Sequence, residues 1–238
     1  MPGNNYFQFK QFKIIQEKAA MRVGTDGVLL GAWANIHNAK KILDVGTGTG
    51  LIALMLAQRC DAQITGIEIE KNAADEATQN VYNSPWKNRI NIKHISFQEF
   101  SEKTSDKFDL IVSNPPFFMN DKPAANSNKN IARHSEKLSL YDLIKGSEKL
   151  LSADGFLSLI LPILSAEKFI KLAKKYRLFL AVHTTVKPRE DKNPNRYLME
   201  FRRNEVPFRK NYIAIRESEN NDFTTAFKTL TRDYYLKF

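Results

Sequence analysis

Cysteine and histidine are scarce in this sequence, with one cysteine, Cys60, and four histidines that show no paired spacing suited to a metal. Disulfide bonds and a zinc site are therefore not expected. No apolar run approaches the length needed to cross a bilayer, and the first residues lack the basic and then hydrophobic layout of a secretory signal. We expect a cytoplasmic protein with no metal and no membrane contact.

Internal repeats and long low-complexity segments are also lacking. Hydrophobic residues make up 42% of the chain and charged residues 26%, as is usual for soluble globular proteins. We predict one domain over residues 1–238, with an N-terminal arm and helix at 1–38 and an α/β core with a basic C-terminal region at 39–238. The oligomeric state stays open, and a monomer is the expectation we favour.

Nearly all of the excess positive charge lies in the last third of the chain. Between Lys168 and Lys210, thirteen Lys or Arg residues face four acidic residues, an excess of nine positive charges in a chain of net charge +10. A surface that binds nucleic acid requires such an excess of positive charge. The alternative is an ordinary solvated helix face near Lys168 to Lys175.

Short β-branched runs alternate with helical stretches in the first half of the sequence. This order predicts a mostly parallel sheet with helices on both faces, joined by right-handed crossovers. Two later extended runs, Leu178 to Val186 and Arg196 to Phe201, predict an antiparallel hairpin. The other expected strands are Ile42–Val45, Ile64–Ile67, Ile90–Ile95, Leu110–Val112, Phe156–Leu161 and Ile213–Arg216. A first helix is expected to begin at Thr25. Further helices are expected at Leu51–Gln58, Ala73–Tyr82, Leu140–Leu151, Ala166–Lys175 and Thr224–Arg232.

Three glycines at alternate positions, Gly46, Gly48 and Gly50, lie between the first core strand and its helix. Glycines in such a turn let a ligand approach the backbone, and the next helix presents free N–H groups. The motif alone is weak evidence, because Gly48 to Ala53 also fits the dinucleotide fingerprint of a NAD enzyme.

Asp44 distinguishes the two cofactors on electrostatic grounds. A carboxylate beside the loop repels a pyrophosphate but attracts the cationic amino group and sulfonium of S-adenosylmethionine. Glu68, at the end of the second core strand, is placed to accept hydrogen bonds from ribose hydroxyls, which both cofactors possess. An exposed strand end with no ligand is the alternative for both acids.

The fourth core strand ends in Asn114-Pro115-Pro116-Phe117. Consecutive prolines stop a strand and fix the backbone that follows. An exocyclic amine on a base is a poor nucleophile because its lone pair is delocalised, so its enzyme needs hydrogen-bond acceptors. We expect the Asn114 side-chain oxygen and the Pro115 carbonyl to accept the two amine hydrogens. Phe117 is expected to stack on the base, with Pro116 beside it.

Together these motifs resemble the class I S-adenosylmethionine-dependent amino-methyltransferases. The segment Met21 to Trp33, the pair Arg133-His134 and the C-terminal hairpin resemble more narrowly the bacterial valine-tRNA (adenine-37, N6) methyltransferase family, over almost the whole chain. The resemblance implies a Rossmann-like seven-stranded sheet, S-adenosylmethionine as donor, and transfer of a methyl group to N6 of an adenine in tRNA.

The resemblance also implies further site residues. Thr25 is expected to bind the cofactor, and Arg133 and His134 either contact the substrate or anchor their loop through a salt bridge. Relatives often carry an acid after the third strand to bind the cofactor's adenine. This sequence has Ser96 and Phe97 there, which we expect to accept a hydrogen bond from the adenine and to pack on it.

Three other functions remain open from the sequence. An rRNA guanine N2-methyltransferase differs chiefly in the residue after the aromatic, often His, where this chain has Phe118. A protein-glutamine N5-methyltransferase usually carries a helical domain before the glycine loop, and only about forty residues precede it here. A non-enzymatic RNA-binding module is disfavoured by the pairing of Asp44 with Asn114.

Overall fold

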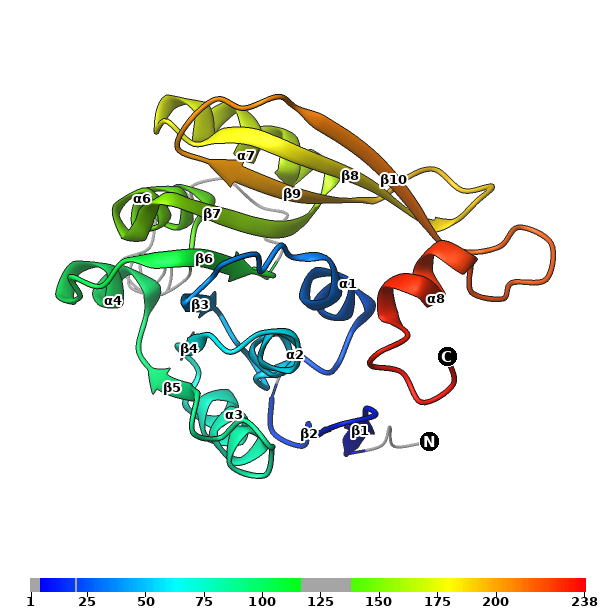
Figure 1. Cartoon of the computed structure of the whole chain (residues 1–238), viewed down its shortest axis with the longest axis horizontal. Coiled ribbons are helices and arrows are strands. Elements are labelled where there is room, and N and C mark those ends of the chain that lie inside the picture. Colours follow the sequence, from blue (N-terminus) through cyan, green and yellow to red (C-terminus); the bar gives the residue numbers. More distant parts are fainter. Residues whose placement is uncertain (1–4, 20, 117–137) are drawn as a thin grey trace, which may run out of the picture.

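An eight-stranded sheet forms the centre of the computed structural model, which describes residues 5–19, 21–116 and 138–238 (Figure 1). Its strand order is β10-β8-β9-β7-β6-β3-β4-β5. The bounds are β3 (Lys41–Val45), β4 (Gln63–Glu68), β5 (Ile90–His94), β6 (Phe108–Ser113), β7 (Leu151–Pro162), β8 (Phe179–Arg189), β9 (Arg196–Arg202) and β10 (Arg209–Arg216). All neighbours are parallel except those of β9, which runs antiparallel to both β7 and β8.

The mostly parallel sheet and the C-terminal hairpin are confirmed, and the sheet has eight strands where the family resemblance implied seven. β10 extends the sheet beyond β8 and pairs with it in parallel, from Arg209 opposite Val182 to Arg216 opposite Arg189. Only Ile213 to Arg216 was expected to be extended. The first half of β10 is exposed and polar, so it lacks the apolar alternation that reveals a strand.

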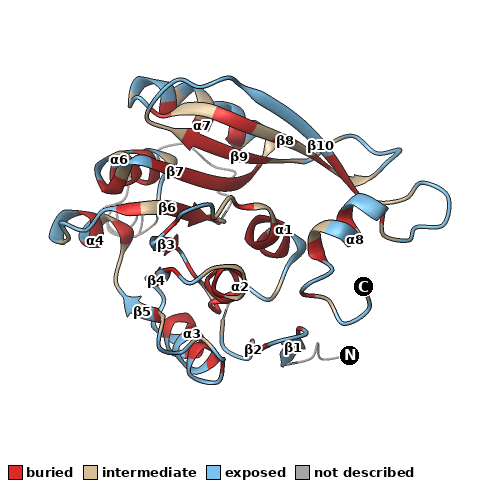
Figure 2. Cartoon of the chain, viewed as in Figure 1, coloured by how far each residue is buried: buried red, intermediate tan, exposed pale blue. Residues whose placement is uncertain are grey.

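Helices cover both faces of the sheet (Figures 1 and 2). One face packs against a core with residues from α1, α2, α3 and α8, and the other against a core with residues from α4, α6 and α7. Figure 2 shows α1 and α2 buried over most of their length, whereas α3, α6 and α7 carry both buried and exposed residues. The bounds are α1 (Thr25–Trp33), α2 (Leu51–Arg59), α3 (Lys71–Tyr82), α4 (Phe97–Lys103), α6 (Leu140–Leu150), α7 (Ile163–Lys175) and α8 (Thr225–Thr231).

A two-stranded hairpin, β1 (Tyr6–Gln8) and β2 (Lys13–Ile15), precedes α1 and was not expected from the sequence. Its strands have three residues each, too few to display a period. The hairpin lies beside the C-terminal tail, where the Lys10 N–H donates to the Tyr234 carbonyl at 2.8 Å and Phe7 packs edge-on against Tyr235.

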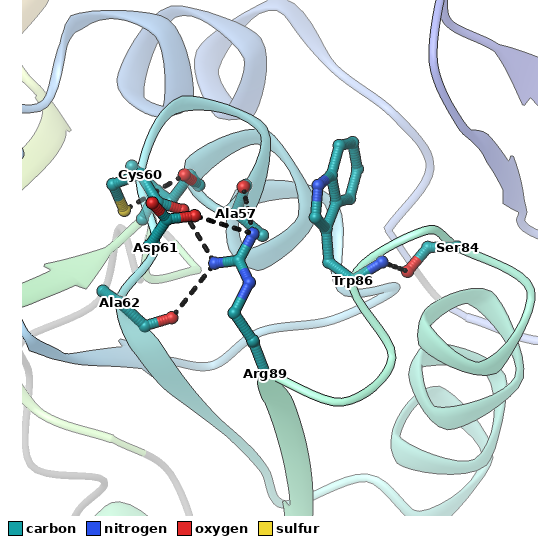
Figure 3. Close-up of polar contacts among 8 residues, drawn as sticks. Ala57, Cys60, Asp61, Ala62, Ser84, Trp86 and Arg89 are labelled. Atoms are coloured by element: carbon teal, nitrogen blue, oxygen red, sulfur yellow. Dashed lines mark hydrogen bonds and ion pairs between the residues drawn. The ribbon is translucent and has the colours of Figure 1, made fainter.

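The C-terminal end of α2 is capped by Arg89, which precedes β5 (Figure 3). Its guanidinium donates to the carbonyls of Ala57 at 2.9 Å and Cys60 at 2.7 Å. A cation at this position satisfies carbonyls that have no partner within the helix and complements the helix dipole. Arg89 thus fixes the C-terminal end of α2, the helix that follows the glycine loop.

Candidate cofactor and substrate site

The glycine loop between β3 and α2 adopts a conformation that favours glycine. Gly46, Gly48 and Gly50 have φ values of 71°, 56° and 83°, in the left-handed region. A side chain at Gly46 or Gly48 would meet nothing within 4 Å, so packing does not exclude it. The backbone conformation requires glycine there, and the open space above the loop suits close approach by a ligand.

Asp44 lies beneath this loop, fully buried at the end of β3. Its Oδ2 accepts from the Thr47 hydroxyl at 2.6 Å and from the Ala53 N–H at 3.1 Å, while Oδ1 has no hydrogen-bond partner in the described part of the chain. Burial raises the pKa of Asp44 from its ordinary 3.8 to about 7, against the lowering effect of its two hydrogen bonds, and the charge of Glu68 adds to the rise. A buried oxygen without a donor fits a cationic ligand.

Glu68 holds the other side of the loop from the end of β4. Its Oε2 accepts from the Gly48 N–H at 2.9 Å, and Oε1 accepts from the N–H groups of Ile69 and Glu70 at 2.9 and 3.0 Å. A carboxylate has about four acceptor positions, so three bonds leave capacity for a hydroxyl. The arrangement fits the expected contact with a ribose.

A cavity of about 330 Å³ joins this loop to α1 and to the end of β6. Thr25, Gly46, Gly48 and Asn114, each expected in the site, lie together in its wall. The cavity is lined also by Met21, Arg22, Gly24, Asp26, Gly27, Thr47, Thr49, Leu51 and Ile52. The segment before the glycine loop and the turn after β6 are therefore parts of one site.

Asn114 follows the last residue of β6, Ser113, whose hydroxyl donates to the Val45 carbonyl at 2.8 Å. That bond ties the ends of the two central strands together. The Asn114 Oδ1 is buried without a partner among the described residues, so the cavity wall holds a free amide acceptor. Pro115 is buried, whereas Pro116 is exposed. Gly27 of α1 leaves room here, since an added Cβ would lie 4.0 Å from the Asn114 amide nitrogen and 3.0 Å from Leu51.

Two residues expected to bind the cofactor, Ser96 and Phe97, do not line this cavity. Ser96 is the N-cap of α4, and its hydroxyl accepts from the Glu99 N–H at 3.1 Å. Phe97 is buried against α6, where an added Cβ on Gly146 would come within 2.4 Å of its ring. Their role in binding adenine stays a prediction. Phe117, Arg133, His134 and the polar loop Asn120 to Asn130 lie outside the described residues.

Two buried polar residues of α3 support the site and were not expected from the sequence. Asn80 donates to the Thr49 carbonyl in the glycine loop and to the Ile15 carbonyl in β2, both at 2.9 Å, and accepts from the Ile15 N–H at 2.8 Å. Glu76 accepts from three consecutive backbone N–H groups, those of residues 17–19, at 2.7 to 3.1 Å. One helix therefore holds both the loop and the chain that leads to α1, a contact that no local motif encodes.

A larger cavity, about 530 Å³, lies where α6 meets the start of β7. Its cations are already bonded: Lys107 donates to the Lys149 carbonyl, Lys149 donates to the Ser101 carbonyl, and Arg203 pairs with Glu148. Its position at the amino end of β7 places it away from the glycine loop. Size alone therefore does not identify the functional site.

Across residues 5–19, 21–116 and 138–238, no helix is long and apolar enough to span a membrane. The same residues include no group of three or more His, Cys, Asp or Glu arranged to hold a metal ion.

Known proteins match this chain in sequence and in fold. The methyltransferase small domain family matches residues 21–162. A tRNA1(Val) (adenine(37)-N6)-methyltransferase of Parabacteroides distasonis is 43% identical over 235 residues, which cover 99% of each chain. One of Trichodesmium erythraeum is 43% identical over 239 residues, covering 99% of this chain and all of that one. The crystal structure of a predicted O-methyltransferase from Agrobacterium tumefaciens matches with a TM-score of 0.69 at 20% identity, covering 88% of this chain and 96% of that chain, which shows the shared fold alone.

Proposed function

Because the chain belongs to the family of tRNA1(Val) (adenine(37)-N6)-methyltransferases, we propose that it transfers a methyl group from S-adenosylmethionine to N6 of adenine 37, next to the anticodon, in a valine tRNA. The observation that carries the proposal is the unpartnered Asn114 Oδ1 in the wall of the cavity that the glycine loop also lines. An acceptor beside a cofactor loop is what transfer to an amine requires.

The glycine loop and its two acids fit the proposed cofactor. The loop is open above Gly46 and Gly48, and the buried Asp44 Oδ1 beneath it has no hydrogen-bond partner among the described residues. Glu68 has acceptor capacity for ribose hydroxyls, and Thr25 lies in the cavity wall nearby. The first two residues of α2, Leu51 and Ile52, line the cavity, so the positive end of this helix suits the cofactor's carboxylate. The cofactor, when bound, supplies a methyl group on a positively charged sulfur.

Asn114 and Pro115 act on the amine by orientation. The Asn114 Oδ1 and the Pro115 carbonyl each accept one amine hydrogen, which draws the nitrogen toward tetrahedral geometry and exposes its lone pair. Orientation of this kind lowers barriers by up to ~7–11 kcal/mol in favourable cases. Phe117 is expected to stack on the base with Pro116 at its edge, and Arg133 and His134 are expected to contact the RNA near it.

The test identifies the nucleoside that the wild-type protein methylates and then compares turnover in wild type and in Asn114→Ala. The wild-type protein, incubated with labelled S-adenosylmethionine and total tRNA, is expected to form N6-methyladenosine, detected by nucleoside mass spectrometry. Formation of N2-methylguanosine instead would assign the guanine activity, and no product in RNA would reject the proposal.

Asn114→Ala removes the acceptor without touching the glycine loop. Turnover is expected to fall on the order of 10²- to 10³-fold, the range for loss of one positioned hydrogen-bonding group, while cofactor affinity by calorimetry is retained. Asn88→Ala, at an exposed asparagine in the turn before β5, is the matched control and is expected to leave turnover unchanged. Normal methylation by Asn114→Ala would reject the role given to this residue.

A further inference from the structure

Side chains from three neighbouring strands form rows on one face of the sheet, at the end where β8 lies between β9 and β10. Tyr197 pairs with Thr185, and Thr185 pairs with Tyr212. In the adjacent row, His183 lies between Met199 and Lys210. Directly paired residues share a face, as do alternate residues along a strand, so both rows lie on the same face.

The aromatic residues of these rows contact one another. The rings of His183 and Tyr197 lie 4.1 Å apart at 71°, and those of His183 and Phe208, just before β10, lie 6.4 Å apart. Tyr212 is 55% exposed and Phe208 52% exposed. We call Tyr197, His183, Phe208 and Tyr212 the aromatic platform. Large rings left half exposed on a sheet face offer flat surfaces for stacking.

The charges beside the aromatic platform are positive. The Lys187 Nζ lies 5.7 Å from the centroid of the Tyr212 ring and donates to the Glu190 carbonyl at 2.9 Å, and Lys210 is exposed beside His183. The two rows contain no acidic residue. Burial and the charge of Lys210 lower the pKa of His183, so its ring is neutral at pH 7, and its buried Nε2 has no partner in the described part of the chain.

The aromatic platform also extends toward the site around Asn114. β8 and β10 run in the same direction as β6, so their carboxyl ends lie at the edge of the sheet where β6 leads into Asn114. Arg196, which precedes Tyr197 and lies on the other face of the sheet, forms an ion pair at 2.9 Å with Asp26 in the cavity wall, so the cavity and the aromatic platform meet at this edge from the two faces. An RNA whose target base occupies the cavity can therefore continue along this edge to the aromatic platform.

We propose that the aromatic platform binds unpaired nucleotides of the RNA substrate by base stacking, with Lys187 and Lys210 at their phosphates. Aromatic rings interleaved with basic side chains are the combination by which sheet surfaces bind single-stranded nucleic acid. Positive charge without acids favours a polyanion over an apolar protein surface. The inference rests on the proposed function, because it concerns the same RNA at a second contact.

The test is the double variant Phe208→Ala/Tyr212→Ala, compared with wild type for binding of valine tRNA and of a labelled single-stranded oligonucleotide. RNA affinity is expected to fall at least about tenfold, since each stacked base is lost with its ring. The KM for tRNA rises accordingly, while kcat at saturating tRNA and cofactor affinity stay unchanged. Phe208→Tyr/Tyr212→Phe keeps both rings and is expected to retain wild-type affinity.

Tyr82→Ala is the matched control, because Tyr82 is 71% exposed on α3 and has the Lys87 Nζ at 5.4 Å from its ring centroid. It is expected to bind RNA as wild type does. Unchanged RNA affinity in the double variant would overturn the inference. Loss of self-association on sedimentation, with RNA affinity intact, would assign the surface to a second copy of the chain. Absence of tRNA methylation by wild type would reject the proposed function instead, and oligonucleotide binding would still decide the role of the aromatic platform.

Discussion

The charged residues that shape the site at β3 and β4 are acidic and buried, whereas those beside the aromatic platform at β8 and β10 are basic and exposed. Asp44 is fully buried and Glu68 is 9% exposed, and both accept backbone N–H groups that shape the glycine loop. Lys210 and Arg209 are exposed at the opposite edge of the sheet. Buried charges act through fixed hydrogen bonds at one place, while exposed charges act together over a surface. The acidic region suits a small cation and the basic region a long polyanion.

The largest expected difference between the two regions is in salt dependence. Raising the salt from about 50 mM to about 200 mM is expected to weaken tRNA binding on the order of 10³-fold, because bound phosphates release counterions. Cofactor binding, which depends on buried groups, is expected to change about threefold or less. Filter binding and calorimetry measure the two affinities, and a parallel fall in both would remove the contrast.

Asp44→Asn tests the acidic region directly. The amide keeps the size of the side chain but loses its charge, so the Kd for S-adenosylmethionine is expected to rise roughly 10- to 100-fold, with tRNA affinity unchanged. Asp109→Asn is the control, because Asp109 lies in the same sheet near the amino end of β6 and accepts from the N–H groups of Lys40 and Lys41. Equal cofactor affinity in Asp44→Asn and wild type would contradict the assignment.

The pH dependence of cofactor binding should follow from the same carboxyl. With the pKa of Asp44 near 7 in the cofactor-free protein, a cationic ligand must displace its proton at lower pH. Affinity is expected to fall up to about tenfold per unit as the pH drops below 7. Calorimetry in buffers of different ionisation enthalpy measures the released proton. Asp44→Asn should abolish the dependence, and its persistence there would assign it to another group.

The same shift predicts how the stability of the cofactor-free protein changes with pH. Because the folded-state pKa of Asp44 lies above its ordinary 3.8, the folded state binds the proton more tightly. Its contribution to the free energy of unfolding is present in full below about pH 4 and is lost as pH rises to about 7. Denaturant titrations at a series of pH values give the free energy of unfolding. Between about pH 4 and pH 7 this free energy is expected to change with pH differently in wild type and in Asp44→Asn.

The smallest expected effect concerns the ion pair between Arg196 and Asp26, which joins the two regions. Both side chains are about one quarter exposed. Asp26→Asn is expected to cost about 1 kcal/mol or less and to lower the Tm by roughly 2–4 °C. Asp75→Asn breaks the exposed pair with Lys71 and is the control, with no measurable change expected. A fall in Tm of equal size in both variants would show that the partly buried pair stabilises the protein no more than the exposed pair does.

Local patterns in the sequence predicted the core strands and the glycine loop because burial and φ requirements act within a few residues. The expected helices agree closely with the observed ones, as at α6 (Leu140–Leu150). α4 was missed because its Phe97 was assigned to the cofactor. β10 was missed in part because its exposed half carries polar residues. Pairing with β8, 27 residues earlier at Arg209 and Val182, is a tertiary contact that composition does not display.

The candidate site was predicted where chemistry is local and missed where it depends on distant packing. Asn114 and the glycines were identified from their own motifs and lie in one cavity. Asp44 was expected to face the ligand, and the structure adds its bonds to Thr47 and Ala53 and its raised pKa, which depend on burial.

The bonds of Asn80 have a consequence for how the sequence is free to vary. The Asn80 side chain forms hydrogen bonds with the backbone of Ile15 and Thr49 and with neither of their side chains. These bonds therefore place no requirement on the residue types at those two positions, whereas they do fix the distance of both from α3. A chimera that exchanged the first 24 residues between relatives should tolerate many substitutions but no insertion or deletion in β2. The hydrogen bonds of Asn80 thus constrain the number of residues in this segment more than their types.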